Sequence, residues 1–544
     1  MARMGRLLAA LAIASFGYGG QAYGADCNAL ASLQLPNTDI TSAKLLPAAP
    51  YTPEGATTPI TGGALPALCE VQATIRPTRD SAIEILVWLP TDWNRKYQQL
   101  GNNGFAGIFK YPEMAENVRR GYAVASTNTG HKNTDSHDAF QVGWGIGHPE
   151  RVTDFAWRSV HELTLKAKEI VREYYGRPAR YSYWNGCSNG GGEGLMQAQR
   201  FPDEFDGIIA GGAAAYWSRA ATAQLFFSSQ LVDHKITEVQ LRAINKAVVQ
   251  ACDANDGVVG DGLIGDPRRC DWSPAALVCR PNQDPGTCLT AEQASAVARV
   301  YAPVRDPASG RVLAGGVTRG SELEWIRRRL SASVSQFGVS NYRLVFQDMA
   351  WNGSSFDLQR DYPKLDALFR DRNAIDPDLR KFRKSRGKMI QYMGWDDSSF
   401  TPGWTVQYYD KVVDKTGRGN TDRKKLEDTR EFYRLYMMPG VGHCGGGPGA
   451  ALTRFDLVTA LEAWVERDIA PEGIKATNDA RTLERPICPY PQEAVYNGAG
   501  DTTKATSFDC RQPLNRIIES GIDVGPVKPT RAARRAYEDD DYED

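Results

Sequence analysis

Residues 179–205 read "ARYSYWNGCSNGGGEGLMQAQRFPDEF" and connect a strand-like run to a helix-like run through a group of glycines. The turn contains the pattern G-x-S-x-G, formed by Gly186, Ser188 and Gly190. A serine at such a strand-to-helix turn has its hydroxyl exposed above the sheet, where it can act as a nucleophile. Glycines suit the turn because a strained backbone tolerates few side chains nearby. The stretch therefore predicts a nucleophile elbow at Ser188.

Two other interpretations of this turn are a purely structural connection and a glycine-rich phosphate loop. No lysine follows the glycines, which argues against the phosphate loop. In the elbow interpretation, Asn189 opens the helix, so its backbone N–H is placed to stabilise an oxyanion.

The sequence around the elbow alternates between strand-like and helix-like segments. The clearest helical pattern covers residues 153–176, with Thr153 or Asp154 as the expected cap and Gly176 as the expected end. Strands alternating with helices indicate a largely parallel sheet covered on both faces, and with the elbow they predict an α/β-hydrolase fold. Strand-like runs occur at 83–89, 98–101, 122–127, 181–184, 207–210, 389–392 and 432–437.

The alternation stops between residues 215 and 385, so we expect a large inserted lid domain there. The core then comprises residues 25–214 and 386–475. Residues 476–544 form a C-terminal extension whose charged end, "RRAYEDDDYED", has the composition of a disordered tail.

A nucleophilic serine needs a base and an acid that orients the base, in the order Ser, Asp or Glu, His for this fold. Only His234 and His443 follow Ser188. His234 lies in a helical part of the insertion and reads as a surface residue, whereas His443 follows a strand-like run, which favours it as the base. In "MGWDDSSF", Asp397 is the preferred acid and Asp396 the reserve; either aspartate could instead be a simple cap.

Cysteines flank two of these residues: Cys187 precedes Ser188 and Cys444 follows His443. If serine and histidine are hydrogen-bonded, their neighbours lie close enough for a disulfide, which needs Cα atoms about 4.4–6.8 Å apart. The competing hypothesis makes Cys187 itself the nucleophile.

The second oxyanion donor is expected after an earlier strand. The stretch "QQLGNNGFAGIF" fits this position, and Gly104 is the preferred donor. An ordinary glycine-rich loop is the alternative.

An acidic stretch in the insertion, "CDANDGVVGDGLIGDPRRC", brings three carboxylates together at Asp253, Asp256 and Asp261. Hard oxygen ligands at this spacing suit Ca²⁺, although the spacing is not that of an EF-hand. Cys252 and Cys270 could staple the loop. The alternative is a surface turn rich in Asp and Gly.

The overall composition narrows the compartment and the partners. A basic start, an apolar run and small residues near position 24 indicate a signal peptide over residues 1–24, and hence a secreted or periplasmic protein. Ten cysteines in an exported chain imply disulfides, and the absence of C-x-x-C argues against zinc. The formal charge of −1 favours neither a nucleic-acid nor a membrane partner.

Together these stretches resemble the tannase and feruloyl esterase family, whose pattern is Cys-Ser, then Asp, then His-Cys. The matching stretches are "GCSNGG", "GWDDSSFTPGW" and "GVGHCGGG", and the resemblance covers residues 65 to 495. It implies triad roles for Ser188, Asp397 and His443, and a structural calcium in the lid. The calcium ligands would include the backbone of Val258 and Leu263, but this loop has one extra residue before Asp261. The disulfides implied are Cys187–Cys444, Cys252–Cys270, Cys279–Cys288 and Cys488–Cys510, which leaves Cys27–Cys69.

The sequence thus predicts a secreted serine esterase that hydrolyses esters of aromatic acids, with feruloyl and other hydroxycinnamoyl esters favoured. Galloyl esters and mono(2-hydroxyethyl) terephthalate are the alternative substrates within the family. The resemblance implies that the lid chooses among these acyl groups, with the stretch "SASVSQFGVSNYRLVFQDMAW" at residues 331–351 as the expected location. A non-catalytic, calcium-stabilised binding protein is the alternative of a different class. The expected partner is a small aromatic ester, and the protein is expected to be a monomer or homodimer.

Overall fold

The computed structural model describes residues 26–512 except 55, 106, 134–139, 307–309 and 311. The predicted signal peptide and the predicted disordered tail lie outside the described residues.

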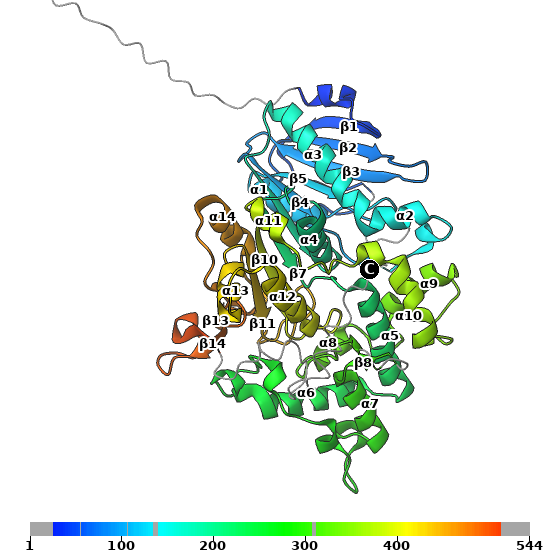
Figure 1. Cartoon of the computed structure of the whole chain (residues 1–544), viewed down its shortest axis with the longest axis vertical. Helices are drawn as coiled ribbons and strands as arrows, with labels where there is room; N and C mark the ends of the chain where they lie inside the picture. The colour runs from blue at the N-terminus through cyan, green and yellow to red at the C-terminus, as the bar shows by residue number, and fades with distance from the viewer. Residues whose placement is uncertain are drawn as a thin grey trace, which may run out of the picture.

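Within this part of the chain, a nine-stranded sheet has the order β1-β2-β3-β5-β4-β6-β7-β10-β11 (Figure 1). The strands from β5 to β11 pair in parallel, whereas β1, β2, β3 and β5 pair antiparallel. Every strand-like run predicted from the sequence falls on a strand of this sheet, and the α/β-hydrolase prediction is confirmed. The strands are β1 (Thr38–Leu46), β2 (Leu68–Ile75), β3 (Ile83–Pro90), β4 (Lys96–Leu100), β5 (Ala123–Thr127), β6 (Tyr181–Cys187), β7 (Gly207–Gly211), β10 (Lys388–Gly394) and β11 (Tyr433–Met438).

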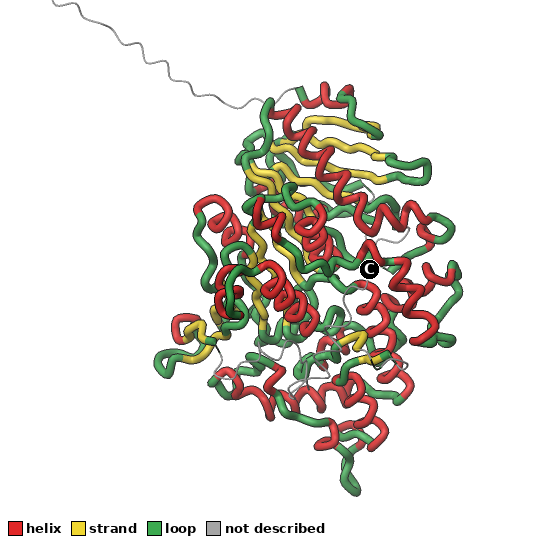
Figure 2. Tube along the Cα trace, viewed as in Figure 1, coloured by secondary structure: helices red, strands yellow, loops and turns green. Residues whose placement is uncertain are grey.

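Helices cover both faces of the sheet, as its buried parallel strands require (Figure 2). Leu461 on α14 and Met114 on α1 belong to one apolar cluster, and Leu163 on α3, Leu195 on α4 and Tyr409 on α12 belong to another. The covering helices are α1 (Tyr111–Arg119) and α14 (Leu457–Arg467) for the first cluster, and α3 (Ser159–Tyr175), α4 (Asn189–Arg200) and α12 (Pro402–Thr416) for the second.

The helix predicted over 153–176 begins earlier than expected. A short helix, α2 (Pro149–Thr153), continues through one π-helical turn into α3, so Thr153 and Asp154 both have helical backbone angles. The predicted cap is therefore wrong, because the chain enters the helix at Pro149, which has the fixed φ of a first helical residue. Gly176 does end the helix, with φ of 67°.

The segment between β7 and β10 is mostly helical. Its helices from α5 to α10 lie toward the lower and right side of Figure 1, away from β1, whereas α11 lies beside the sheet near β10. The segment leaves the sheet at the carboxyl end of β7, the edge where the predicted site residues lie. We call this segment the lid; its predicted limits of 215 and 385 stay a prediction. It contains α5 (Trp217–Asp233), α6 (Glu238–Cys252), α7 (Ala291–Tyr301), α8 (Glu322–Arg327), α9 (Gln336–Phe346), α10 (Leu358–Leu368), α11 (Arg380–Lys384), β8 (Val304–Arg305) and β9 (Val312–Ala314).

Two small hairpins follow α14 near the end of the described chain. A further helix, α13 (Asp422–Thr429), precedes β11. The hairpin strands are β12 (Ile474–Thr477) with β13 (Glu484–Ile487), and β14 (Glu493–Tyr496) with β15 (Phe508–Arg511).

Candidate active site

The predicted elbow forms a sharp turn between β6 and α4. Ser188 has φ of 65° and ψ of −123°, which is rare for a residue with a side chain. The turn is held by a hydrogen bond from the Ser188 N–H to the Gly211 carbonyl, 2.9 Å long. It also needs glycine: a Cβ added at Gly101 would lie 2.5 Å from the Gly190 Cα. The loop after β4 can therefore touch the elbow directly.

Ser188, His443 and Asp397 come together at the carboxyl edge of the sheet. The Oγ of Ser188 lies 2.8 Å from Nε2 of His443, and Nδ1 of His443 lies 2.7 Å from Oδ2 of Asp397. All three side chains are buried. An ionised carboxylate only accepts hydrogen bonds, so Nδ1 carries the proton and Nε2 is free to accept the serine proton.

Backbone donors orient the acid of this group. The second oxygen of Asp397, Oδ1, accepts the N–H groups of Ser399 at 2.7 Å and Phe400 at 3.1 Å. The acceptor of the His443 Nδ1–H is Asp397 and not the reserve, Asp396. Burial raises the pKa of Asp396 well above its usual value, with added repulsion from Glu322 and Glu324.

The ten cysteines all lie in the described part of the chain and form five disulfides. Cys187 and Cys444 are joined, with Cα atoms 5.8 Å apart, so Cys187 is not a free thiol. The five bonds are the pairs that the resemblance implied: Cys27–Cys69, Cys187–Cys444, Cys252–Cys270, Cys279–Cys288 and Cys488–Cys510.

The two predicted oxyanion donors lie on adjoining segments. Asn189 is the first residue of α4, where a backbone N–H has no partner within the helix. Gly104, with φ of 50°, and Asn103 line the same pocket as Ser188. The N–H groups of Asn189 and Gly104 donate to no described residue.

A pocket of ≈ 660 Å³ opens over Ser188 and His443 between the core and the lid. Its aromatic walls are in mutual contact: the ring centroids of Trp217 and Phe337 are 4.9 Å apart, and those of Phe400 and His443 are 5.3 Å apart. Phe337 lies in the lid stretch 331–351, where the sequence places the choice of acyl group, and Phe400 belongs to the quoted stretch around Asp397. Trp217 is the wall residue that sequence reasoning missed. The lid residues of the pocket are Trp217, Gln224, Arg327, Arg328, Arg329, Leu330, Ser333, Val334, Ser335, Gln336 and Phe337.

Three arginines line this pocket, and they differ in whether a carboxylate pairs with them. Arg327 and Arg328 both pair with the buried carboxylate of Glu324. Arg329 is exposed and has no carboxylate partner among the described residues. Its positive charge is therefore available to a bound anion, together with the one positive charge that Glu324 leaves uncompensated on Arg327 and Arg328.

The other downstream histidine, His234, lies away from this site. Its Nδ1 is 2.9 Å from the Gln230 carbonyl, and its Nε2 is 3.2 Å from Nη2 of Arg299. These contacts belong to the lid helices α5 and α7, and none involves the triad.

The acidic stretch forms a loop closed by the Cys252–Cys270 disulfide. Asp253 accepts the N–H groups of Gly260 and Gly262, and Asp261 pairs with Arg485. Burial and the charge of Asp261 raise the pKa of Asp256 to about 6. Oxygen donors that repel one another have the chemistry that Ca²⁺ takes.

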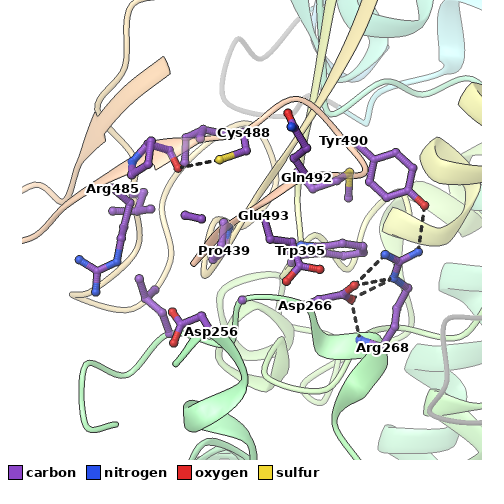
Figure 3. Close-up of a pocket in the computed structure, with 17 residues that line it drawn as sticks. Asp256, Asp266, Arg268, Trp395, Pro439, Arg485, Cys488, Tyr490, Gln492 and Glu493 are labelled. Carbon is purple, nitrogen blue, oxygen red and sulfur yellow. Dashed lines mark hydrogen bonds and ion pairs between the residues drawn. The ribbon is translucent and has the colours of Figure 1, made fainter. Parts of the chain in front are cut away.

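In the described part of the chain, no group of three or more His, Cys, Asp or Glu side chains is arranged closely enough to hold a metal. Figure 3 shows Asp256 and Arg485 on one side of a cavity of ≈ 30 Å³, about the space of one water molecule. On the other side, the buried pair Asp266–Arg268 reaches Tyr490. The carboxylates of the acidic loop are of the donor type that calcium binds. In this structure their oxygens are held by backbone N–H groups of the loop and by Arg485.

None of the helices in the described ranges is long and apolar enough to cross a membrane.

The strand order, the elbow and the Ser-His-Asp geometry define an α/β-hydrolase. The sequence of residues 69–511 matches the family model described as tannase and feruloyl esterase, and the chain belongs to that family. It is therefore a carboxylic ester hydrolase.

Three known proteins are similar to this chain. An uncharacterized esterase of Xanthomonas campestris pv. campestris is 34% identical over 94% of this chain and 95% of its own. The crystal structure of feruloyl esterase B from Aspergillus oryzae has a TM-score of 0.80 and 28% identity, covering 90% of this chain and 100% of that one. Tannin acyl hydrolase from Aspergillus niger, with a TM-score of 0.73 at 21% identity over 91% of this chain and 96% of its own, shares the fold.

Proposed function

We propose that Ser188, His443 and Asp397 catalyse hydrolysis of aromatic-acid esters through an acyl-enzyme. The observation that carries this proposal is the hydrogen-bonded chain from Ser188 Oγ through His443 to Asp397, at the floor of an aromatic pocket. A histidine held in this tautomer can take the serine proton and return it to a leaving group.

In the proposed first half-reaction, Nε2 of His443 removes the proton from Ser188 Oγ, and Oγ bonds to the ester carbonyl carbon. The negative charge that develops on the carbonyl oxygen is stabilised by the backbone N–H groups of Asn189 and Gly104. The tetrahedral intermediate collapses, the bond to the alcohol oxygen breaks, and the alcohol leaves with the proton from His443.

In the second half-reaction, water gives a proton to Nε2 and its oxygen attacks the acyl carbon. The acyl–Ser188 bond then breaks, the acid departs, and Oγ regains its proton from His443. Asp397 keeps Nδ1 protonated throughout, and it stabilises the imidazolium that forms in each half.

Feruloyl and related hydroxycinnamoyl esters are the proposed substrates. Phe337, Trp217 and Phe400 offer ring faces to a planar acyl group. Polar side chains of the same pocket, Gln224 and Ser335, are placed to meet ring hydroxyls and are already hydrogen-bonded to each other at 3.1 Å. The related structures of feruloyl esterase B and tannin acyl hydrolase support an aromatic acyl group.

One observation favours a second candidate, the monoester of terephthalic acid. Such a substrate carries a carboxylate on its ring, and Arg329 brings to the pocket a guanidinium that pairs with no carboxylate of the described residues. Arginine recognises carboxylates through paired N–H donors. Galloyl esters have the ring hydroxyls but no such charge.

A substrate panel separates these candidates: methyl ferulate, methyl gallate and mono(2-hydroxyethyl) terephthalate, each with wild type and with Arg329→Gln. If ferulate is the substrate, its kcat/KM is the highest of the three and changes less than threefold in the variant. If the terephthalate monoester is the substrate, its kcat/KM is highest and falls about tenfold or more in the variant, the usual loss for a charged hydrogen bond. Lack of turnover of all three esters would contradict the proposed acyl group and favour the binding-protein alternative.

Calcium and export complete the proposal. The acidic loop would hold Ca²⁺ through Asp253, Asp256 and Asp261 with the backbone carbonyls of Val258 and Leu263, and bound calcium would stabilise the lid. The segment over residues 1–24 would direct export, and five disulfides fit an oxidising compartment.

A further inference from the structure

A buried polar cluster lies beneath the elbow and joins three parts of the chain. Glu193, on the second turn of α4, accepts the N–H of Asn102 at 3.0 Å and the side-chain amides of Asn102 at 3.3 Å and Asn189 at 3.1 Å. Arg372, from the lid, donates its Nε to the Asn189 side-chain oxygen at 3.0 Å and its Nη2 to the Asn189 carbonyl at 3.1 Å. Glu193, Asn189 and Arg372 are completely buried.

The partners identify Glu193 as an ionised carboxylate. Every group that faces its two oxygens is an N–H donor, and a protonated carboxyl would need an acceptor for its own proton. A lone buried carboxylate is costly, and burial does raise the pKa of Glu193. The nearby positive charge of Arg372 compensates the charge of Glu193. The Asn189 side-chain amide lies between the two and is hydrogen-bonded to both.

The position of Arg372 depends on a missing side chain. A Cβ added at Gly192 would lie 3.0 Å from Nη2 of Arg372 and 2.7 Å from the carbonyl oxygen of Ala214. The ring of Trp217, which also lines the substrate pocket, lies 4.8 Å from the guanidinium carbon. The guanidinium is thus confined between the elbow helix and the pocket wall.

These contacts fix the two segments that would hold the oxyanion. One donor is on the elbow, at Asn189, and the other is on the loop that contains Asn102 and Gly104. Glu193 ties Asn102 to α4, and a 2.7 Å bond from the Gly190 N–H to the Asn102 carbonyl closes the same junction. Oxyanion donors act only when they are preorganised, because their gain comes from avoiding reorganisation during the reaction.

We propose that Glu193 and Arg372 are positioning residues that hold the two halves of the oxyanion hole in register, so that the lid takes part in catalysis through Arg372. This inference rests on the proposed function of Ser188. Neither side chain touches the substrate. The pair acts by fixing the backbone of Asn189 and of the loop after β4.

The test begins with Glu193→Gln, which keeps the shape but replaces one acceptor with a donor that faces other donors. Loss of one oxyanion donor lowers kcat by about 10²–10³-fold. In Glu193→Gln the donors are displaced but not lost, so we expect kcat to fall about 10- to 100-fold and KM to change less than threefold. Rates are expressed per Ser188 that reacts with an aryl phosphonate, so unfolded protein does not count.

Glu70→Gln is the matched control. Glu70 is equally buried, on β2, and its carboxylate accepts the Tyr51 hydroxyl at 2.7 Å and the Trp88 indole at 3.0 Å. It is expected to lower the melting temperature without lowering kcat per titrated serine.

A second readout separates positioning from general damage. A trifluoromethyl ketone that forms a hemiketal with Ser188 places an oxyanion in the hole, whereas the product acid does not. In Glu193→Gln the ketone should lose affinity in parallel with kcat, while the dissociation constant of the product acid stays within twofold. Equal losses for both ligands, or wild-type kcat per titrated serine, would overturn the proposal.

Two milder variants keep the test decisive if Glu193→Gln does not fold. Asn189→Ala keeps the backbone N–H but removes the amide between Glu193 and Arg372, and Arg372→Lys keeps the charge but not the two-point grip on Asn189. Each should lower kcat about tenfold with the same selective loss of ketone affinity. Wild-type values for both would refute the inference. If Ser188 itself does not react with the phosphonate in wild type, the proposed function fails instead.

Discussion

The elbow and the acidic loop are similar in sequence but are held in different ways. Both are rich in glycine, and both adjoin a half-cystine. In the elbow, Ser188 and Asn189 are held by partners far away in the chain, at Gly211, His443 and Arg372. In the acidic loop, most carboxylate oxygens accept N–H groups a few residues away, and Arg485 is the distant partner of Asp261.

The elbow gives the stronger evidence of function, because its contacts are long-range. Long-range contacts specify one geometry for the elbow, because several segments must agree on it. Local contacts specify a turn, and a turn by itself does not select a ligand. We therefore expect changes at the elbow to affect activity and changes in the acidic loop to affect stability only.

The largest effect is expected from Ser188→Ala. Removal of the hydroxyl should lower kcat for aromatic esters by roughly 10⁴-fold or more, because it removes the atom that forms the acyl-enzyme. Thermal unfolding should stay close to wild type. The control is Ser182→Ala, which changes a buried serine on β6, the strand that leads to Ser188, and this variant should keep full activity. Ester hydrolysis retained by Ser188→Ala would disprove the triad assignment.

An intermediate effect is expected from the disulfide beside the triad. Cys187→Ala with Cys444→Ala opens a loop whose ends are 257 positions apart, which costs about 5 kcal/mol of unfolding free energy on the chain-entropy model. Because the bond also holds His443 near Ser188, we expect kcat to fall about tenfold or more, and a reductant to inactivate the wild-type enzyme.

The matched control for that variant is Cys279→Ala with Cys288→Ala, where the half-cystines are only 9 positions apart. This pair should lower the unfolding free energy by about 3 kcal/mol and leave kcat unchanged. Equal kcat for both double variants would show that the Cys187–Cys444 bond contributes to stability only.

The smallest effect is expected in the acidic loop. Added Ca²⁺ should raise the melting temperature by a few degrees relative to a chelator, because a ligand that binds only the folded state stabilises it. Asp256→Asn should abolish that difference in differential scanning calorimetry, with kcat at room temperature nearly unchanged. If the chelator has no effect on wild type, calcium does not bind in this loop.

Much of the core was predictable from its sequence pattern. The buried parallel strands are short apolar runs, so each of them was found. The antiparallel strands β1 and β2 were not, because β1 is partly exposed along its length and β2 contains polar residues. Glu70 in β2 is buried because Tyr51 and Trp88 donate hydrogen bonds to it and Lys44 pairs with it, contacts that no local pattern reveals.

The active site, too, contains residues that the sequence predicted and residues that it did not. The spacing of cysteines and the order of Ser188, Asp397 and His443 were readable, because each follows a strand and parallel strands end at one edge of the sheet. The pocket wall was readable only in part. The lid stretch 331–351 supplies Ser333 to Phe337, but the contacts of Phe337 with Trp217 depend on the folded lid.

The chemistry of this protein follows from its sequence: a serine in a glycine-rich turn, a histidine and an aspartate after later strands, and cysteines beside two of them. Local backbone preferences and strand order suffice for that. How these groups are held follows from the folded chain, in which Arg372 and Glu193 are buried against Asn189, and Arg329 reaches the pocket without a carboxylate partner among the described residues. Such contacts join residues far apart in the chain, and their cost and benefit depend on burial, which is a property of the whole fold.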